Sequence, residues 1–268
     1  MPFSVLMSLY HKERPEFLRQ SLDSVFGQTM APDEVVLVED GPLTKELYDV
    51  LCEYESRYPQ LKRVPLKVNQ GLGKALNEGL KHCSHDLVAR MDTDDVAVRE
   101  RFAEQVVFMH EHSDIAVCSS WIEEFIGETS NVSAVKKLPE NHEEIYAYAK
   151  RRCPINHPAV IYRRSAVMSS GGYGPFPEDY YLWGKMLKDG CRFHNIAKSL
   201  LLFRSSDDVY KRRGGWNYFI AMSRLQRFLY NIGFLSLGEY MYNTSIRSVV
   251  SLVPNWMRKQ IYTRFLRK

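Results

Sequence analysis

The sequence predicts an α/β protein with a mostly parallel central sheet, helices on its faces and a helical extension at the C-terminal end. Short apolar runs alternate with amphipathic stretches from Phe3 to about Cys118, a pattern typical of a parallel sheet covered by helices. The 268 residues are 45% hydrophobic and 25% charged, which suits one large core with an appendage. Because the pattern changes beyond Asp208, we expect a main domain over residues 1–208 and an extension over residues 209–268.

Five apolar runs are the expected strands of the first half. They cover residues 3–9, 34–38, 64–68, 86–91 and 115–118. The amphipathic stretches between them predict helices over residues 16–28, 44–58, 72–81 and 98–112. Pro15 suits a first helical position, where its missing N–H is not needed, and the Thr44 side chain is expected to cap the second helix.

The chain after the fifth strand alternates less clearly. We expect residues 121–156 to be irregular apart from one helix near residues 143–152. The stretch GGYGPFP, residues 171–177, predicts a loop, and Gly190 is expected to close the helix that follows it. Two short late strands are expected at residues 193–196 and 200–204.

Residues 209–268 are strongly basic. They contain 11 Lys and Arg residues against the single acidic residue Glu239, whereas residues 1–208 contain 25 against 31. Apolar residues recur there at helical spacing among basic ones, and Pro254 is expected to end or kink that helix. The apolar positions are Ile246, Val249, Val250, Val253 and Met257, and the basic ones are Arg247, Arg258, Lys259, Arg264, Arg267 and Lys268. This pattern indicates an anionic partner, either phospholipid or nucleic acid, and the alternative is a solvated helical face.

The cysteines and the N-terminal residues bear on the compartment. The five cysteines form no C-x-x-C pair, so neither a disulfide framework nor a zinc site is expected, and a reducing cytosol is indicated. The first apolar run has no basic leader and no clear cleavage site, so we do not expect a signal peptide. No stretch reaches the roughly 18 uninterrupted apolar residues that a membrane span requires. We therefore expect a cytoplasmic protein that does not cross a membrane.

Three carboxylates directly follow the fourth expected strand. Asp92, Asp94 and Asp95 lie in the stretch ARMDTDD, at the sheet edge where open α/β folds bind ligands. Crowded carboxylates repel one another, and a divalent cation such as Mg²⁺ or Mn²⁺ relieves the repulsion. The alternative is an exposed turn with a chance D-x-D triplet. A calcium-binding EF-hand loop is excluded, because its fifth and twelfth positions would be Val96 and Ala103.

Residues at the ends of the other strands point to the same sheet edge. Glu39 and Asp40, in VVLVEDG, could accept hydrogen bonds from a uracil imide or a ribose hydroxyl. In NQGLGKALNEGL, Gly71 allows close backbone approach and Lys74 could pair with a phosphate. Tyr10, just past the first strand, could stack on a base. Each also has a structural alternative: a turn at Asp40, a helix entry at Gly71 and a core contact at Tyr10.

Taken in order, these blocks resemble family 2 glycosyltransferases of the GT-A fold, a Rossmann-like architecture. The blocks are SVLMSLYHKERPEFLRQSLDSVFGQT, VVLVEDG, NQGLGKALNEGL, ARMDTDD and FPEDYYLWGKMLKDG. The resemblance covers roughly residues 3–204, and the order of five blocks is far more specific than any one of them. The chain departs from residues frequent in the family at Ser8, His11, Glu39, Ser205 and Ser206.

The resemblance implies a nucleotide-sugar site with a divalent metal ion. Asp94 and Asp92 would hold Mg²⁺ or Mn²⁺, which would neutralise the diphosphate leaving group, and Asp95 would lie behind them. The residues implied to bind the nucleotide are Leu9, Tyr10, Glu39, Asp40, Asn69, Gly71, Lys74, Asp92 and Arg204.

The resemblance also implies transfer with inversion, which needs one base that deprotonates the acceptor hydroxyl. Asp179 would be this catalytic base, and Glu178 and His157 would lie on the acceptor side. Without the resemblance, the acidic pair at residues 178 and 179 reads as helix N-terminal capping. His157 reads equally well as a hydrogen-bonded loop residue, and Trp183 as helix packing.

The function implied is transfer of one sugar from a nucleotide sugar to a saccharide acceptor. UDP is favoured as the nucleotide by its frequency in the family, and a lipid-diphosphate-linked acceptor of bacterial surface polysaccharide synthesis is favoured by the basic tail. That tail would lie on an anionic membrane, which places the protein peripherally on the inner face of the plasma membrane. No nucleic acid partner is expected. Processive polymerisation is not expected either, because no Q-x-x-R-W motif is present.

Three competing functions remain open from the sequence. A sugar-phosphate nucleotidyltransferase shares the metal and nucleotide chemistry, but LYHKERPE lacks the usual glycine-rich loop after the first strand. A phosphatase with an aspartate nucleophile generally carries its acidic motif on the first strand. A non-catalytic scaffold, with a basic tail for nucleic acid or membrane, would need no base at position 179.

Overall fold

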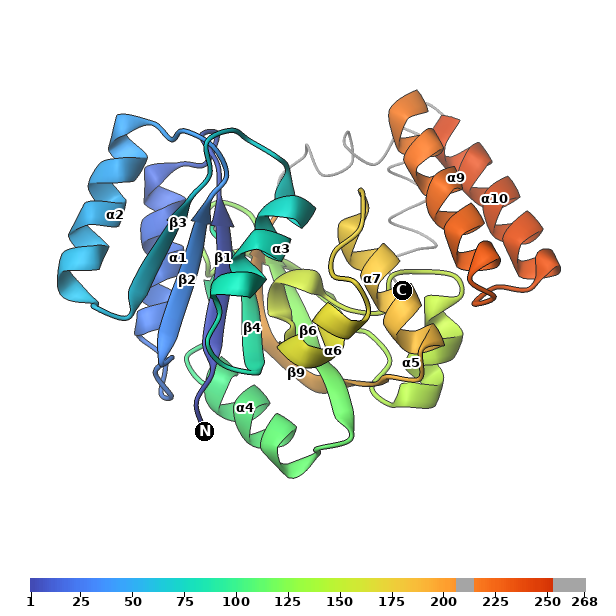
Figure 1. Cartoon of the computed structure of the whole chain (residues 1–268), viewed down its shortest axis with the longest axis horizontal. Coiled ribbons are helices and arrows are strands. Elements are labelled where there is room, and N and C mark those ends of the chain that lie inside the picture. The colour runs from blue at the N-terminus through green and yellow to red at the C-terminus, as the bar shows by residue number, and fades with distance from the viewer. Residues whose placement is uncertain (206–214, 253–268) are drawn as a thin grey trace.

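The computed structural model describes residues 1–205 and 215–252 (Figure 1). The strands are β1 (Ser4–Leu9), β2 (Glu34–Glu39), β3 (Leu61–Pro65), β4 (Leu87–Asp92), β5 (Val96–Ala97), β6 (Ile115–Phe125), β7 (Val132–Lys136), β8 (Ile161–Arg163) and β9 (Arg192–Arg204). The helices are α1 (Pro15–Phe26), α2 (Lys45–Arg57), α3 (Leu72–His82), α4 (Arg101–Glu111), α5 (His142–Ala149), the 3-10 turn η1 (His157–Ala159), α6 (Arg164–Ser169), α7 (Glu178–Lys188), α9 (Trp216–Asn231) and α10 (Leu237–Leu252).

The described strands form one nine-stranded sheet in the order β3-β2-β1-β4-β8-β6-β9-β5, with β7 paired to β6. The four N-terminal strands pair in parallel with one another, β3 with β2, β2 with β1 and β1 with β4, as predicted. Beyond β4 the sheet is mixed, because β8 runs antiparallel to both β4 and β6, while β6 and β9 form a long parallel pair. The predicted α/β class is confirmed, and the parallel half carries the carboxyl strand ends where ligands bind.

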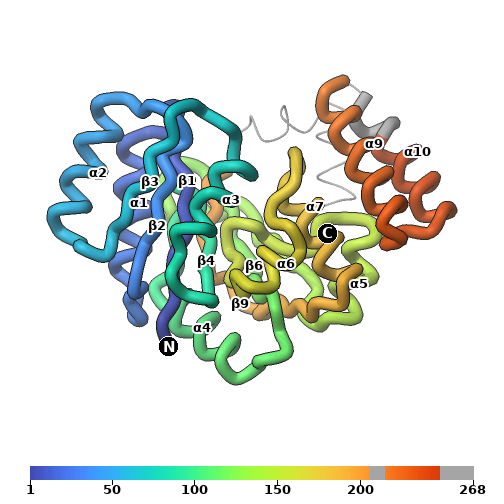
Figure 2. Tube along the Cα trace, viewed as in Figure 1, coloured from blue at the N-terminus to red at the C-terminus, as the bar shows by residue number. Residues whose placement is uncertain are grey.

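Alternate residues of β1 divide the core into two layers. Val5 and Met7 pack in a buried cluster with residues of α1, α2 and α4, whereas Leu6 packs in a second cluster with residues of α3, α7 and α9. This follows from the two-residue period of a strand, which sends successive side chains to opposite faces. Figure 2 shows the same arrangement along the chain, with α1 and α2 on one side of the first strands and α3 on the other.

The N-terminal boundaries follow the sequence closely, with one shift. Pro15 begins α1, and the Thr44 hydroxyl accepts a hydrogen bond from the Leu47 amide (3.4 Å) as the predicted cap of α2. The third strand was predicted three residues too late, because β3 ends at Pro65, which lacks an N–H for continued pairing, and Val68 is exposed.

The middle of the chain is more regular than predicted. β6 continues to Phe125 instead of ending at Cys118, because the polar residues that extend it are buried and hydrogen-bonded, as Ser119 is to the Asn156 carbonyl (3.1 Å). Residues 121–156, which were expected to be irregular apart from one helix, therefore also contain the end of β6 and the strand β7. The expected helix is α5. The two expected late strands are one strand, β9, and the fourth helix begins at Arg101 instead of residue 98.

The described part of the C-terminal extension, residues 215–252, contains the helices α9 and α10, and α9 packs beside α7 (Figure 1). Buried residues of α9 join the core cluster that contains α3 and α7, so the extension shares the hydrophobic core of the main domain. Among the described residues, no helix is long and apolar enough to span a bilayer. The expected apolar residues Val253 and Met257, Pro254, and the basic residues from Arg258 onward lie outside the described residues.

We predict that Gly41→Ala lowers the free energy of unfolding more than Gly190→Ala does. Both glycines have left-handed φ angles, +86° and +89°, which cost a non-glycine residue about 1–2 kcal/mol. An added Cβ at Gly41 would also lie 2.6 Å from the Asn69 amide nitrogen, whereas at Gly190 it would meet nothing within 4 Å. Urea denaturation measures the loss in free energy of unfolding for each variant. Equal losses would contradict the steric argument, because they would show that the backbone at Asn69 accommodates the added Cβ at no cost.

Candidate active site

The parallel strands bring the predicted site residues to one edge of the sheet. The register pairs Leu9 of β1 with Glu39 of β2 and Ser8 with Asp92 of β4, so the polar residues after each strand emerge side by side. The predicted nucleotide and metal residues therefore share one edge. Asp92, Asp94 and Asp95 offer ligand atoms that all lie within 4.8 Å of one another.

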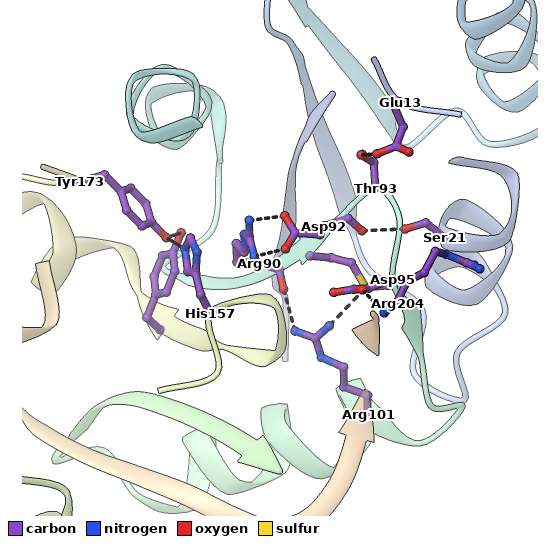
Figure 3. A network of polar contacts seen from close by, with 12 residues as sticks. Glu13, Ser21, Arg90, Asp92, Thr93, Asp95, Arg101, His157, Tyr173 and Arg204 are labelled. Atoms are coloured by element: carbon purple, nitrogen blue, oxygen red, sulfur yellow. Dashed lines mark hydrogen bonds and ion pairs between the residues drawn. The ribbon is translucent and has the colours of Figure 1, made fainter. Parts of the chain in front are cut away.

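Arg90 neutralises the first of these carboxylates. Its guanidinium donates to both oxygens of Asp92, with Nη1 2.7 Å from Oδ2, and the arginine is only 1% exposed (Figure 3). A bidentate pair fixes the carboxylate as well as neutralising it. Sequence reasoning missed this role, although residues 90 and 92 are two apart on a strand and so point to the same face.

Asp94 and Asp95 are held less favourably. Burial, followed by the charges of Asp92 and Glu13, raises the pKa of Asp94 to about 7. Burial and the two neighbouring aspartates also raise the pKa of Asp95, although its Oδ1 accepts a hydrogen bond from the Arg204 amide (2.8 Å). The Oδ2 atom of Asp95 is buried without a hydrogen-bond partner. The cluster thus holds more negative charge than its described surroundings neutralise.

Arg204 holds the acidic loop in place. Its Nε donates to the Asp94 carbonyl (2.8 Å), and further nitrogens donate to the carbonyl of Gly127 and to the Gln20 side chain. The guanidinium lies over the ring of Phe17, 3.9 Å from its centroid. These contacts explain the position of the arginine, and its contact with nucleotide phosphates stays a prediction.

Two further charged groups border the cluster and were not predicted. Glu13 accepts a hydrogen bond from the Thr93 hydroxyl (2.9 Å), and burial raises the pKa of Glu13. Arg101 lies fully buried beneath β4, where it donates to the Arg90 carbonyl (2.7 Å). Burial, then the charge of Arg90, lowers the pKa of Arg101 to about 9, which still leaves it charged at pH 7.

Asp40, one of the residues predicted to bind the nucleotide, holds the loop of residues 69–71 through hydrogen bonds. Its carboxylate accepts hydrogen bonds from the amides of Gln70 (2.7 Å) and Gly71 (3.0 Å), and the Asn69 side chain donates to its carbonyl (3.1 Å). Asp40 is 3% exposed, so its carboxylate holds the loop rather than reaching into solvent. Sequence reasoning correctly grouped Asp40, Asn69 and Gly71, and direct nucleotide contact by Asp40 stays a prediction.

Glu39 and Leu9 are also buried, while Tyr10 and Lys74 face solvent. One Glu39 oxygen accepts a hydrogen bond from Nε of Arg63 (2.6 Å), which raises the pKa of that arginine. The Leu9 side chain lies in the core and its carbonyl accepts from the Asp40 amide (2.7 Å), so any nucleotide contact by Leu9 would involve the backbone. Tyr10 is 41% exposed and Lys74 is exposed, so both are available to a ligand.

Two hydrogen bonds connect α3 to the loop before α7, and they bring the predicted acceptor-side residues at the start of α7 toward this edge. The Asn77 side chain donates to the Tyr173 carbonyl (2.9 Å) and accepts from the Tyr173 amide (2.8 Å). A Cβ at Gly73 would lie 2.8 Å from the Gly174 carbonyl oxygen and 3.0 Å from the Glu178 Cβ, so only glycine allows this approach. The start of α7 is therefore held against α3.

Asp179 lies in the first turn of α7 and is partly exposed. Its Oδ1 accepts a hydrogen bond from the Tyr180 amide (2.8 Å), and its Oδ2 lies 3.4 Å from the Cys153 thiol. Burial, then the charge of Asp179, raises the pKa of Glu178, and Asp92 contributes to the same shift. Asp92 and Glu178 therefore lie within electrostatic reach of each other.

His157 lies beneath the site. It is 9% exposed, its Nε2 lies 3.2 Å from the Tyr173 hydroxyl, and burial together with Arg90 lowers its pKa, so the ring is neutral at pH 7 (Figure 3). These contacts agree with the structural alternative for His157, and an acceptor contact stays a prediction. Trp183 is fully buried, as expected for helix packing.

The chain matches the model of glycosyl transferase family 2 over residues 4–170, and it belongs to that family. An uncharacterised glycosyltransferase of Haemophilus influenzae is 42% identical over 268 residues, covering 100% of each chain. The Escherichia coli UDP-Gal:alpha-D-GlcNAc-diphosphoundecaprenol beta-1,3-galactosyltransferase is 40% identical, covering 99% of this chain and 97% of that protein. The amylovoran biosynthesis glycosyltransferase AmsE of Erwinia amylovora is 38% identical and covers 98% of each.

Solved structures show the same fold. TarS 1–349 from S. aureus superposes with a TM-score of 0.65 at 19% identity, covering 99% of this chain and 75% of that one. In a longer TarS structure this chain spans 43% of the length. A mannosyltransferase of Pyrobaculum calidifontis superposes with a TM-score of 0.59 at 13% identity. The predicted GT-A fold and family membership are confirmed, and the chain is a glycosyltransferase.

We predict that Asp94→Asn stabilises the metal-free protein at neutral and higher pH. An aspartate whose pKa is raised to about 7 on folding destabilises the folded state increasingly as pH rises from about 4, its value in the unfolded chain, to about 7. Asparagine removes this cost, so the variant should melt higher in EDTA above pH 6, with the gain shrinking toward pH 4. Thermal melts across this range test it, with Asp49→Asn, an exposed aspartate of α2, as the control. A gain that is independent of pH would contradict the electrostatic explanation.

Proposed function

We propose that the protein is a metal-dependent, inverting glycosyltransferase that moves one hexose from a UDP-sugar to a lipid-diphosphate-linked saccharide in surface polysaccharide synthesis. One observation carries the proposal: the acidic cluster follows β4 at the sheet edge, and its Asp92 interacts electrostatically with Glu178, the neighbour of Asp179 at the start of α7. The donor and acceptor classes are those in the name of the Escherichia coli relative, which aligns over nearly all of both chains. Closely related enzymes can still differ in the sugar they transfer.

The donor set suits Mg²⁺ or Mn²⁺. Three carboxylates lie within 4.8 Å, and one oxygen of Asp95 is buried without a partner. Both oxygens of Asp92 are already paired with Arg90, so Asp94 is the side chain best placed to hold the ion, with Asp92 beside it. When bound, the ion would neutralise charge on the departing diphosphate.

The remaining edge residues suit the nucleotide. Tyr10 presents an exposed ring past β1 for the base, and Glu39 keeps one oxygen that Arg63 does not take. Lys74, in the first turn of α3, adds a positive charge and helical N–H groups for phosphate oxygens. Asp40, Asn69 and Gly71 shape the loop that carries these groups.

Asp179 is the proposed general base. It is a partly exposed carboxylate at the edge that carries the metal cluster, and it would take the proton of the acceptor hydroxyl as that oxygen attacks the sugar. Glu178 lies next to it, with a pKa raised by burial. The nucleotidyltransferase and scaffold alternatives are not favoured, because the family model covers residues 4–170 and the relatives that align end to end are glycosyltransferases.

We also propose that the C-terminal extension lies on an anionic membrane. The segment of residues 209–268 has a large excess of basic residues. Its described helices also expose large apolar side chains, at Trp216, Leu237, Met241, Tyr242 and Ile246. Exposed apolar side chains combined with basic charge are typical of helices that lie in a membrane interface. This position would bring the active site to a lipid-linked acceptor.

Asp179→Asn is expected to abolish transfer while leaving binding of UDP-sugar unchanged. Loss of a general base costs about 10²–10⁴-fold in rate, whereas the nucleotide groups lie elsewhere on the edge. Transfer from UDP-galactose and UDP-N-acetylglucosamine to a GlcNAc-diphosphate-lipid measures the rate, and metal-dependent thermal stabilisation measures binding. Asp189→Asn, at the far end of α7, is the control. Full activity of the Asp179 variant would contradict the proposal, as would stabilisation by no UDP-sugar.

Replacement of Leu237, Met241 and Ile246 by serine is expected to reduce flotation with phosphatidylglycerol vesicles. These side chains are 45–61% exposed, so their removal spares the core that α9 shares with α7. Val68→Ser and Val132→Ser, also exposed but on other faces, serve as the control. Equal flotation of both variants would show that this face does not dock.

A further inference from the structure

The loop between α5 and η1 is held by two different helices. The Tyr180 hydroxyl of α7 donates to the Ala149 carbonyl (2.6 Å), the Asn243 side chain of α10 donates to the Lys150 carbonyl (2.7 Å), and Arg247 of α10 donates to the Arg151 carbonyl (2.6 Å). Three successive carbonyls are thus anchored. The C-terminal extension supplies two of the three donors.

The contacts between α10 and this loop include buried polar side chains. Asn243 is 5% exposed, and its amide also donates to the side chain of Gln226 in α9 (2.9 Å), which is fully buried. An ion pair between Lys150 and Glu239 (3.0 Å) adds a third contact between the loop and α10. Buried, paired polar groups of this kind fix one arrangement, because breaking them leaves unsatisfied donors.

Further along the same loop, the Cys153 side chain contacts Asp179. The Cys153 sulfur lies 3.4 Å from Asp179 Oδ2 and 3.6 Å from the Ile155 carbonyl oxygen. Burial, then the charge of Asp179, raises the pKa of the Cys153 thiol, so the thiol keeps its proton and can donate it. The other carboxylate oxygen of Asp179 is bound by the Tyr180 amide.

We propose that Cys153 is a positioning residue for Asp179, and that α10 sets its place through the loop of residues 150–153. The proposal rests on Asp179 being the general base. The Tyr180 amide contacts one oxygen of the Asp179 carboxylate and the Cys153 thiol contacts the other. These two contacts restrain the carboxylate to one orientation about its Cβ–Cγ bond. Efficient proton transfer needs the base within hydrogen-bond reach of the hydroxyl, so loss of this restraint lowers the rate of the chemical step and not the binding of the donor.

Three variants at position 153 and a matched cysteine test the thiol. Cys153→Ala is expected to lower kcat about five- to tenfold with KM for the UDP-sugar unchanged, since a weak hydrogen bond to a charged group is lost. Cys153→Ser, which keeps a donor, should recover most of the rate, whereas Cys153→Val, of similar size without a donor, should not. Cys191→Ala, a partly buried cysteine in contact with neither Asp179 nor the loop, should behave as wild type.

Arg247→Ala tests the connection from α10. This variant removes the donor to the Arg151 carbonyl and should lower kcat in the same way, again with KM unchanged. It should also raise the rate at which maleimide labels Cys153, read by peptide mass spectrometry, because the loop that carries the thiol is released. Arg224→Ala, in α9, is the control, and thermal melts establish that all variants fold.

The outcomes separate this inference from the proposed function. If Asp179→Asn abolishes transfer but Cys153→Ala and Cys153→Val keep the wild-type kcat, the positioning role is wrong and the base assignment stands. If Cys153→Ser is as slow as Cys153→Val, the side chain acts through packing and the proposal is overturned. If Asp179→Asn transfers sugar normally, both proposals fail together. An unchanged labelling rate in Arg247→Ala would remove α10 from the mechanism.

Discussion

The site depends on the ion pair between the buried Arg90 and the partly exposed Asp92. Three carboxylates lie within a few residues at the end of a buried strand, and like charges at such separation interact strongly where water is excluded. The bidentate contact with Arg90 fixes the Asp92 carboxylate, and Arg101 adds a second buried positive charge beneath it. Burial and the neighbouring carboxylates raise the pKa values of both Asp94 and Asp95. Arg90 thus holds one aspartate of the cluster, and Asp94 is the proposed ligand of a cation.

The strand ends that border the candidate site were predicted well, because strand bounds are readable from the sequence. Short apolar runs place β1, β2 and β4 within a residue or so of their observed bounds, and parallel pairing then gathers Asp40 and Asp92 at one edge. Sequence reasoning could not tell that the Asp40 carboxylate holds a loop, since that depends on backbone amides of residues 70 and 71. Arg90 was overlooked for a related reason, because a charged residue inside a strand reads as a solvent-facing position.

The later fold was less predictable, because polar residues are buried there. Ser119, Ser120 and Asn195 lie within the long strands β6 and β9 and are fully buried, so hydrophobic periodicity breaks off where the strands continue. The Ser119 hydroxyl and the Asn195 side-chain NH₂ donate to carbonyls of neighbouring loops, those of Asn156 and Pro154, contacts that join residues far apart in sequence. Cys153 belongs to this region, and its contact with Asp179 could not be inferred from spacing.

Helix α3 joins the proposed nucleotide side of the candidate site to its proposed acceptor side. Its N-terminal end is tied to the nucleotide side by the Gly71 amide, which donates to Asp40, and its middle is tied to the acceptor side by Asn77 and Tyr173. Inverting transfer requires a base on one face of the sugar and a leaving group on the other, so the distance between these sides must be fixed. A helix anchored at two points along its length fixes this distance better than loops alone would. The close approach at Gly73 keeps α7 against that helix, so the position of Asp179 relative to Asp94 follows from the packing of α3.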